Sequence, residues 1–260
     1  MNAALRQSTR HAANVVRSAA AFLYPPVCAR CSAPLPVTPS TSHLESRWCQ
    51  PCLNQLTPPI SPRCFRCSAP VGPYLDTNSA CIHCRSDRFA FERAVSIGIY
   101  DGTLREACLA AKQPGGHTTA AALGDLLALH HGNDLRQQQL DLVVPLPHHW
   151  LERIARPHLP PDVIARRLAR YLGITCDVHV LAKTRRTPPQ SSLHATDRRR
   201  NLRGAFRVRH KTPLARRNVL LVDDVFTTGT TAHRAARELL AGGAARVLLA
   251  VAARSIARRT

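Results

Sequence analysis

The chain has 260 residues, with 36 basic and 16 acidic side chains, so its formal net charge is +20. Hydrophobic residues make up 45% of it, which suffices for packed cores and argues against a mostly disordered protein. No apolar run approaches the roughly 20 residues of a membrane-spanning helix, and residues 1–24 lead into Tyr24-Pro25-Pro26 without the cleavage site of a secretory signal.

The positive charge has two interpretations. It predicts an anionic partner, such as nucleic acid, a nucleotide, polyphosphate or a membrane surface. Only three of the 36 basic residues are lysines, however, and with abundant Ala this bias is also typical of a GC-rich genome, in which part of the Arg is solvated surface. No acidic residue precedes Glu45, a pattern shared by mitochondrial transit peptides and N-terminal amphipathic helices.

The N-terminal third has two parts. Apolar residues recur at a loose helical spacing over residues 1–24, which predicts a helix that Pro25 and Pro26 end. Residues 25–90 are rich in Pro, Ser and Cys and show little periodicity. Such a segment cannot bury a core of its own size and needs a covalent or metal cross-link.

Eight of the ten cysteines form four C-x-x-C pairs, a spacing that favours metal binding over disulfides and indicates a reducing, cytoplasmic compartment. Four pairs make two tetrahedral zinc sites with no open coordination position, which predicts structural zinc. The neighbour assignment takes Cys28, Cys31, Cys49 and Cys52 for one ion and Cys64, Cys67, Cys81 and Cys84 for the other. This is the simplest assignment, and an interleaved pairing is also compatible with the spacing.

The remaining candidates in this group are assigned structural roles. His83 lies inside the last pair and is interpreted as a neighbour of the metal ligands or an exposed residue. Cys108 and Cys176 are interpreted as buried structural thiols. Because each zinc site is local, loss of a ligand such as Cys49 is expected to unfold one module and leave residues 93–260 largely folded.

From residue 93 apolar strands alternate with helices, which predicts an α/β domain: a parallel sheet with helices on its faces. We therefore divide the chain into an N-terminal helix (1–24), a zinc module (25–90) and an α/β domain (93–260), with a polar, Arg-rich loop at 183–203. The predicted strands are 94–100, 141–145, 178–181, 218–222 and 247–252, and the predicted helices are 103–112, 118–131, 162–172 and 231–241.

Strand 218–222 delivers Asp223 and Asp224 at its C-terminal end, and a Thr/Gly loop leads from there into the next helix. Open α/β sheets bind ligands at this edge, and successive backbone N–H groups beside a helix N-terminus suit a phosphate. Adjacent carboxylates suit the two hydroxyls of a ribose. The segment predicts a ribose 5-phosphate site, in which a side chain at Gly229 would enter the phosphate's space; the alternative is an incidental acidic pair.

This segment resembles the PRPP-binding motif of type I phosphoribosyltransferases. The resemblance implies that Asp223 and Asp224 bind the ribose hydroxyls and that a Mg²⁺ bridges the ribose and the pyrophosphate. It also implies that the 5′-phosphate is bound by the loop residues Thr227, Thr228, Gly229, Thr230 and Thr231.

With a double zinc-ribbon module in front of this motif, the chain resembles the ComF family of bacterial competence proteins, which includes the GntX-like proteins. The start of the zinc module at 23–28 matches that family. So do Tyr100, Gly102, Lys112, Thr187, Gln190, Leu193, Arg198, Asn201, Ala205 and Phe206. One segment departs: where the family carries Arg-Gly-Phe-Asn-Gln, Arg156 is followed here by Pro157-His158-Leu159-Pro160, which bears on turnover more than on ribose-phosphate binding.

Further candidates surround the predicted site. Loop 183–203 is interpreted as a lid over pyrophosphate, or as a solvated charge run. Its candidate residues are Arg185, Arg186, Gln190 and Arg198, followed by Arg199. Lys112 is a candidate pyrophosphate contact, or a helix-end lysine that complements the dipole. His148 and His149 lie at the same edge.

Two functions follow from the sequence. The first is an enzyme that transfers phosphoribose from PRPP to an unidentified acceptor, with Mg²⁺ and with pyrophosphate as leaving group. The second is a non-catalytic accessory protein of competence or DNA uptake. That protein would sense PRPP or a nucleotide and engage single-stranded or duplex DNA and a DNA-uptake helicase.

Overall fold

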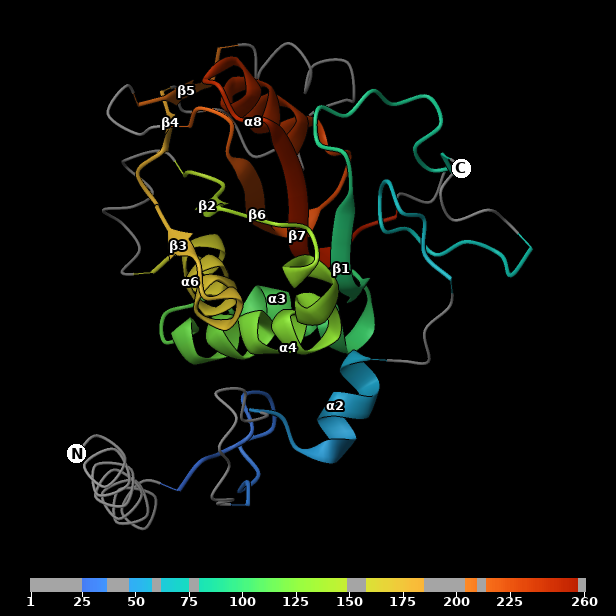
Figure 1. Cartoon of the computed structure of the whole chain (residues 1–260). Helices are drawn as coiled ribbons and strands as arrows, with labels where there is room; N and C mark the ends of the chain where they lie inside the picture. Colours follow the sequence, from blue (N-terminus) through green and yellow to red (C-terminus); the bar gives the residue numbers. More distant parts are fainter. Residues whose placement is uncertain are drawn as a thin grey trace, which may run out of the picture.

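A computed structural model describes residues 25–36, 47–57, 62–74, 80–148, 158–184, 204–209 and 214–256 (Figure 1). The helix predicted for residues 1–24 lies outside these ranges. None of the helices within them is both long and apolar enough to cross a membrane.

The core of the molecule is a five-stranded sheet in the order β1-β7-β6-β2-β3, and every neighbouring pair is parallel. The α/β prediction is therefore confirmed. Residues 219–222 and 247–253 of the two central strands are buried. Helices cover both faces of the sheet, which explains why these strands are continuously apolar. The strands are β1 (Ala94–Ile99), β2 (Leu142–Pro145), β3 (Thr175–Cys176), β6 (Asn218–Phe226) and β7 (Arg246–Arg254).

Three helices pack on one face of the sheet and one helix on the other (Figure 1). The first group contains α3 (Gly102–Ala110), α4 (His117–Arg136) and α6 (Pro160–Leu172), and the single helix is α8 (Thr230–Ala241). Prolines open α6, and Gly173 at φ 73° ends it, as expected of a helix with a left-handed C-cap.

The predicted strand 178–181 is replaced by two shorter strands. β3 ends at Cys176 on the edge of the main sheet, and β4 (Leu181–Lys183) pairs antiparallel with β5 (Phe206–Val208). β5 was not predicted, because a three-residue strand whose partner lies more than 20 positions earlier leaves no periodic signal. Residues 185–203 of the predicted loop lie outside the described residues.

The two zinc modules begin with the same seven-residue pattern, Cys-x-Arg-Cys-Ser-Ala-Pro, at 28–34 and 64–70. In each copy the first cysteine N–H donates to the alanine carbonyl at 2.8 Å. The serine is left-handed in both, with φ 59° at Ser32 and 58° at Ser68. The Sγ atoms form the two sets of the neighbour assignment: Cys28, Cys31, Cys49 and Cys52, and Cys64, Cys67, Cys81 and Cys84. Within each set the four Sγ atoms all lie within 4.8 Å of one another. Two four-thiolate sites of this kind are suited to structural zinc.

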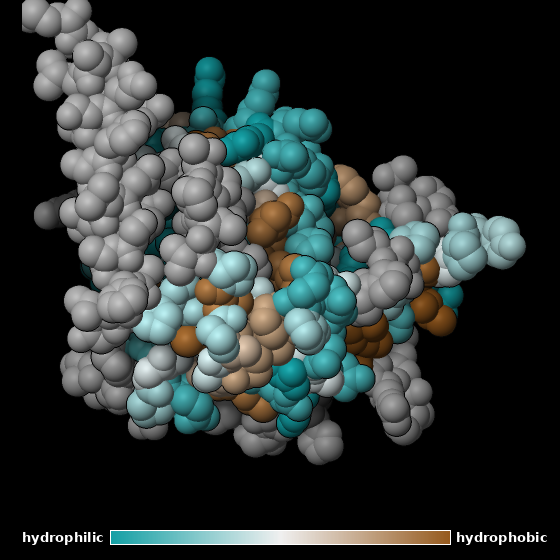
Figure 2. Space-filling model, turned by 90° about the horizontal axis from the view of Figure 1, so that it is seen from below, coloured by the Kyte–Doolittle hydropathy of each residue, from teal (hydrophilic) through white to brown (hydrophobic). Residues whose placement is uncertain are grey.

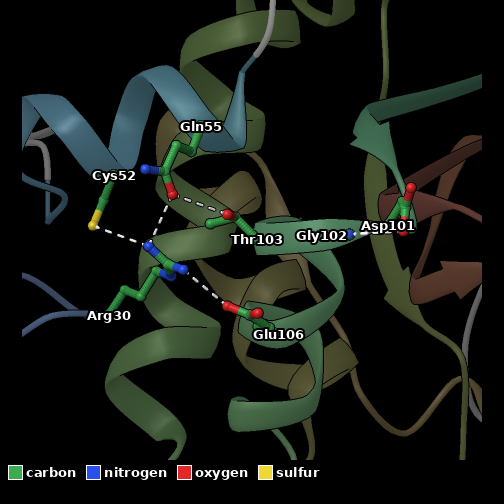
Figure 3. Close-up of polar contacts among 7 residues, drawn as sticks. All are labelled: Arg30, Cys52, Gln55, Asp101, Gly102, Thr103 and Glu106. Atoms are coloured by element: carbon green, nitrogen blue, oxygen red, sulfur yellow. Dashed lines mark hydrogen bonds and ion pairs between the residues drawn. The ribbon is translucent and has the colours of Figure 1, made fainter.

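The first zinc module (residues 25–57) packs on α3 and α4 and carries the short helix α2 (Gln50–Leu56). Arg30 donates to Gln55 of α2 at 3.0 Å and to Glu106 of α3 at 2.9 Å (Figure 3). Residues 119–128 of α4 are all buried. This part of the helix lies between the sheet and the first zinc module and therefore has no exposed face.

The first zinc module is part of the main core, contrary to the expectation that the zinc sites are local. Trp48 is 3% exposed and Leu56 1% exposed, and both belong to the core that includes α3, α4 and α6. The Trp48 indole donates to the Ala122 carbonyl at 3.2 Å. Asp125 of α4 is buried between Arg47 of the module and Arg167 of α6. Unfolding this module would thus expose the outer side of α4.

The second zinc module (residues 62–91) packs on the opposite face of the sheet, where it shares a core with α8. Two of its four arginines make internal hydrogen bonds: Arg63 donates to Ser96 Oγ at 3.3 Å, and Arg66 to the Asp87 carbonyl at 2.7 Å. The sheet and its helices therefore lie between two zinc modules.

On the face of the molecule seen from below, hydrophobic side chains reach the surface in patches separated by hydrophilic ones (Figure 2).

Candidate functional site

Asp223 and Asp224 lie near the end of β6, which continues to Phe226, so the strand includes the acidic pair. In the sheet, β6 lies between β7 and β2. Both carboxylates therefore lie at the carboxyl ends of the parallel strands, where ligands bind in folds of this class. Asp223 Oδ1 accepts from the Asp224 N–H, and Asp224 Oδ1 accepts from the Val225 N–H, both at 2.8 Å. Each carboxylate is thereby oriented by the next peptide group.

Lys112, in the turn after α3, forms an ion pair with the second of these residues: its Nζ lies 2.7 Å from Asp224 Oδ2. Burial opposes ionisation of Asp224, but the Lys112 ammonium outweighs it and lowers the pKa of Asp224. Burial and the neighbouring carboxylate raise the pKa of Asp223 well above its usual range. The Lys112 ammonium therefore favours the ionised form of Asp224, while burial and its neighbour disfavour ionisation of Asp223.

The Thr/Gly loop joins β6 to α8 through Gly229, which has φ 75° and is the N-cap of α8. Thr228 and Thr230 form a hydroxyl–hydroxyl hydrogen bond of 3.0 Å across this turn. A residue that sequence reasoning missed holds the start of the loop: Arg254, which ends β7 and is 5% exposed. Its guanidinium donates to the carbonyls of Phe226, Thr227 and Ser255.

Two aromatic rings of the second zinc module pack against Phe226, at the start of the loop. Phe89 and Phe91 stack with ring centroids 4.7 Å apart, and both meet the Phe226 ring edge-on. A Cβ at Gly229 would lie 2.6 Å from Phe89 and from Phe226. The expectation that a side chain there would enter the phosphate's space is therefore corrected, because it would first strike these rings.

The structure places the other candidates as follows. His148, after β2, lies near enough to Asp224 to contribute to its lowered pKa. His158, in the departing segment, lies 3.3 Å from the Ala111 carbonyl, beside Lys112. Cys108 of α3 is buried as predicted, and its burial raises its pKa to about 12. Outside the described residues lie Arg185, Arg186, Gln190, Arg198, Arg199 and His149.

Two family models match the chain, one in its C-terminal part and one in its N-terminal part. Residues 163–260 match the phosphoribosyl transferase domain, and residues 19–85 match the double zinc ribbon domain. Adenine phosphoribosyltransferase from Saccharomyces cerevisiae aligns with a TM-score of 0.34 and 20% identity, over 56% of this chain and 71% of that one, a likeness too weak to carry an argument.

Three curated relatives align over most of their length. DNA utilization protein YhgH is 31% identical in Escherichia coli K12, over 71% of this chain and 80% of the relative. In Salmonella typhi it is 30% identical, over 86% and 94%. Competence protein F of Haemophilus influenzae is 28% identical, over 74% and 83%. The chain, with its double zinc ribbon and phosphoribosyl transferase domain, therefore belongs to the ComF family.

Proposed function

We propose that this protein binds PRPP or a related ribose 5-phosphate ligand at the end of β6 and transfers the phosphoribosyl group to an acceptor. The observation that carries the proposal is the arrangement of Asp223 and Asp224, with Lys112 2.7 Å from Asp224, directly before the loop that opens α8. Carboxylates, an ammonium group and a helix N-terminus are the groups that ribose hydroxyls, pyrophosphate and a 5′-phosphate require.

Each group has a defined role in this proposal. Asp223 and Asp224 accept hydrogen bonds from the ribose hydroxyls, and the loop from Thr227 to Thr231 binds the 5′-phosphate. Carboxylate oxygens are also ligands for Mg²⁺, which when bound neutralises charge on the pyrophosphate. Transfer breaks the bond between ribose C1 and the pyrophosphate oxygen and forms a bond from C1 to the acceptor. Lys112, released from Asp224 by the ligand, stabilises the negative charge on the departing pyrophosphate.

Replacing Asp224 with Asn tests the ligand site. Loss of its charge-assisted hydrogen bonds is expected to weaken PRPP binding by about 1–3 kcal/mol, measured by calorimetry in the presence of Mg²⁺. Asp177→Asn is the matched control, because Asp177 directly follows β3 at the same edge of the sheet. Equal affinity in Asp224→Asn and the parent protein would contradict the site.

Pyrophosphate release from PRPP with a panel of acceptor bases tests the transfer step.

DNA binding is the second candidate function. It is favoured by the +20 charge and by relatives named for DNA utilization and competence. Because Arg63 and Arg66 make internal hydrogen bonds, the exposed arginines of the second zinc module are Arg85 and Arg88. Arginine pairs phosphate oxygens bidentately, so these two residues are the candidate contacts.

Affinity for DNA is expected to fall steeply with salt, by ~10³ between about 50 and 200 mM if about six phosphates are contacted. Alanine at Arg85 and Arg88 should lower it further. Alanine at Arg207 in β5 and at Arg209 just after it, both exposed, removes the same charge elsewhere and should have little effect. Equal losses in the two double variants, measured by fluorescence anisotropy, would show that charge alone is responsible.

A further inference from the structure

The two zinc modules hold their cysteines at different depths. In the second module all four cysteines are buried, and none is more than 8% exposed. In the first module Cys28 and Cys52 are buried, but Cys31 is exposed and Cys49 is half-buried. Cys67, which occupies the position of Cys31 in the repeated turn, is 0% exposed. The first module therefore presents metal-ligating sulfur to solvent, whereas the second encloses it.

The two accessible cysteines of the first module also lie next to each other. Cys31 Sγ and Cys49 Sγ are 3.5 Å apart. A metal-bound cysteine is a thiolate, which is the form that peroxides oxidise, and an exposed sulfur is oxidised before a buried one. A sulfenic acid formed at Cys31 therefore has a second thiolate within reach, with which it can condense to a disulfide.

We propose that Cys31 and Cys49 form an oxidation site, at which a peroxide converts the two zinc ligands into a disulfide and releases the zinc of the first module. The Cys31 thiolate attacks hydrogen peroxide, whose O–O bond breaks: one oxygen stays on the sulfur as a sulfenic acid and the other leaves as water. Cys49 then forms the S–S bond and displaces the second oxygen as water. The two thiolates supply two electrons, and solvent supplies two protons. Cys28 and Cys52 remain, and two thiolates do not complete a structural zinc site.

Arg30 connects this site to the α/β domain (Figure 3). Its guanidinium lies 3.8 Å from the sulfur of the zinc ligand Cys52, and it donates to Gln55 of α2 at 3.0 Å and to Glu106 of α3 at 2.9 Å. Gln55 in turn accepts from the Thr103 hydroxyl of α3 at 3.1 Å. Release of the zinc removes the constraint on Cys52 and is expected to loosen α3, while the second module keeps its zinc.

Zinc release from the intact protein during treatment with hydrogen peroxide tests the proposal. A chromogenic chelator should report one zinc ion per chain released at least about tenfold faster than the other, because buried thiolates react only after local opening. Alkylation of the remaining thiols and mass spectrometry should place the first disulfide between Cys31 and Cys49. Equal release rates at the two sites, or a first disulfide at any other pair of cysteines, would overturn the proposal.

Two variants separate this oxidation site from the other thiols. Cys31→His keeps a zinc ligand but removes the exposed sulfur, so this variant should hold two zinc ions and lose the fast release. Cys176→Ser removes a half-buried cysteine outside both sets of four and should release zinc as the parent protein does. Fast release in Cys31→His would overturn the proposal. If that variant does not retain two zinc ions, the position of the first disulfide in the parent protein decides.

Hydrogen exchange tests the connection to the α/β domain. After oxidation, amides of α3 should lose protection, and dithiothreitol with added zinc should restore it. Amides of α8, which packs with the second zinc module, should keep their protection throughout. Unchanged exchange in α3 after release of one zinc ion would overturn the part of the proposal that depends on Arg30.

Discussion

Substitution of Gly229 is expected to weaken ligand binding, because the new side chain would clash with the aromatic rings that pack against the loop and would displace the loop. Gly229 has φ 75°, and a Cβ there would lie 2.6 Å from Phe89 and Phe226. A left-handed alanine costs roughly 1–2 kcal/mol, and overpacking adds roughly 1–3 kcal/mol. Valine, branched at Cβ, should cost more. We expect Gly229→Ala to lower ribose 5-phosphate affinity by more than about tenfold, and Gly229→Val to abolish measurable binding.

Gly204 provides the matched control for this prediction. It has φ 68°, and a Cβ there would meet no atom within 4 Å. Gly204→Ala therefore incurs the backbone strain without the clash, and both thermal unfolding and calorimetry should show the smaller effect. Combining Gly229→Ala with Phe89→Leu should restore part of the lost affinity, because the smaller side chain relieves the overlap. Equal losses in the two alanine variants would show that backbone strain alone is responsible.

The main sheet and the position of the acidic pair could be predicted because their signals are local. Residues 219–222 form a continuous apolar run that only a strand buried on both faces requires, and Asp223 ends this run. The following glycine and threonines locate the turn and the N-terminus of α8. Sequence spacing of the cysteines likewise limited the zinc sites to two sets of four.

The supports of the site could not be predicted, because they join residues far apart in the chain. Lys112 was a candidate for the site, but its contact with Asp224, 112 positions later, was not foreseen. Phe89 packs against a loop that begins at Thr227. In the sequence Arg254 follows the predicted strand 247–252 and shows no sign of a role in the site, because its hydrogen bonds to loop carbonyls depend on β7 lying beside β6. No periodicity encodes which ring or charge will face the loop once the sheet has formed.

The same reason explains the incorrect view of the zinc modules as independent units. Trp48 stands beside Cys49, and the sequence around it shows no helical or strand periodicity that would mark it as core. In the structure its ring is buried against α4, and Arg47 reaches the buried Asp125. The short module thus stabilises, and is stabilised by, a helix that begins about 70 residues later.

Replacing Cys52 with Ser is therefore expected to destabilise the α/β domain as well as the first zinc module. Zinc content should fall from two ions per chain to one, because a serine hydroxyl is a poor replacement for a thiolate. Loss of the module exposes Trp48 and Leu56, each worth about 1.5–3 kcal/mol of burial, and removes Arg47 from Asp125. Several kcal/mol of the free energy of unfolding should be lost.

Metal analysis together with hydrogen exchange checks this prediction. Amides of α4 should lose protection in Cys52→Ser, since residues 119–128 are buried partly by the first zinc module. Cys176→Ser is the control, because Cys176 is half-buried at the sheet edge and belongs to neither four-cysteine cluster; it should keep two zinc ions and full protection of α4. Unchanged exchange in α4 after loss of one zinc would show that the module unfolds alone, which would contradict the coupling through Trp48 and Asp125.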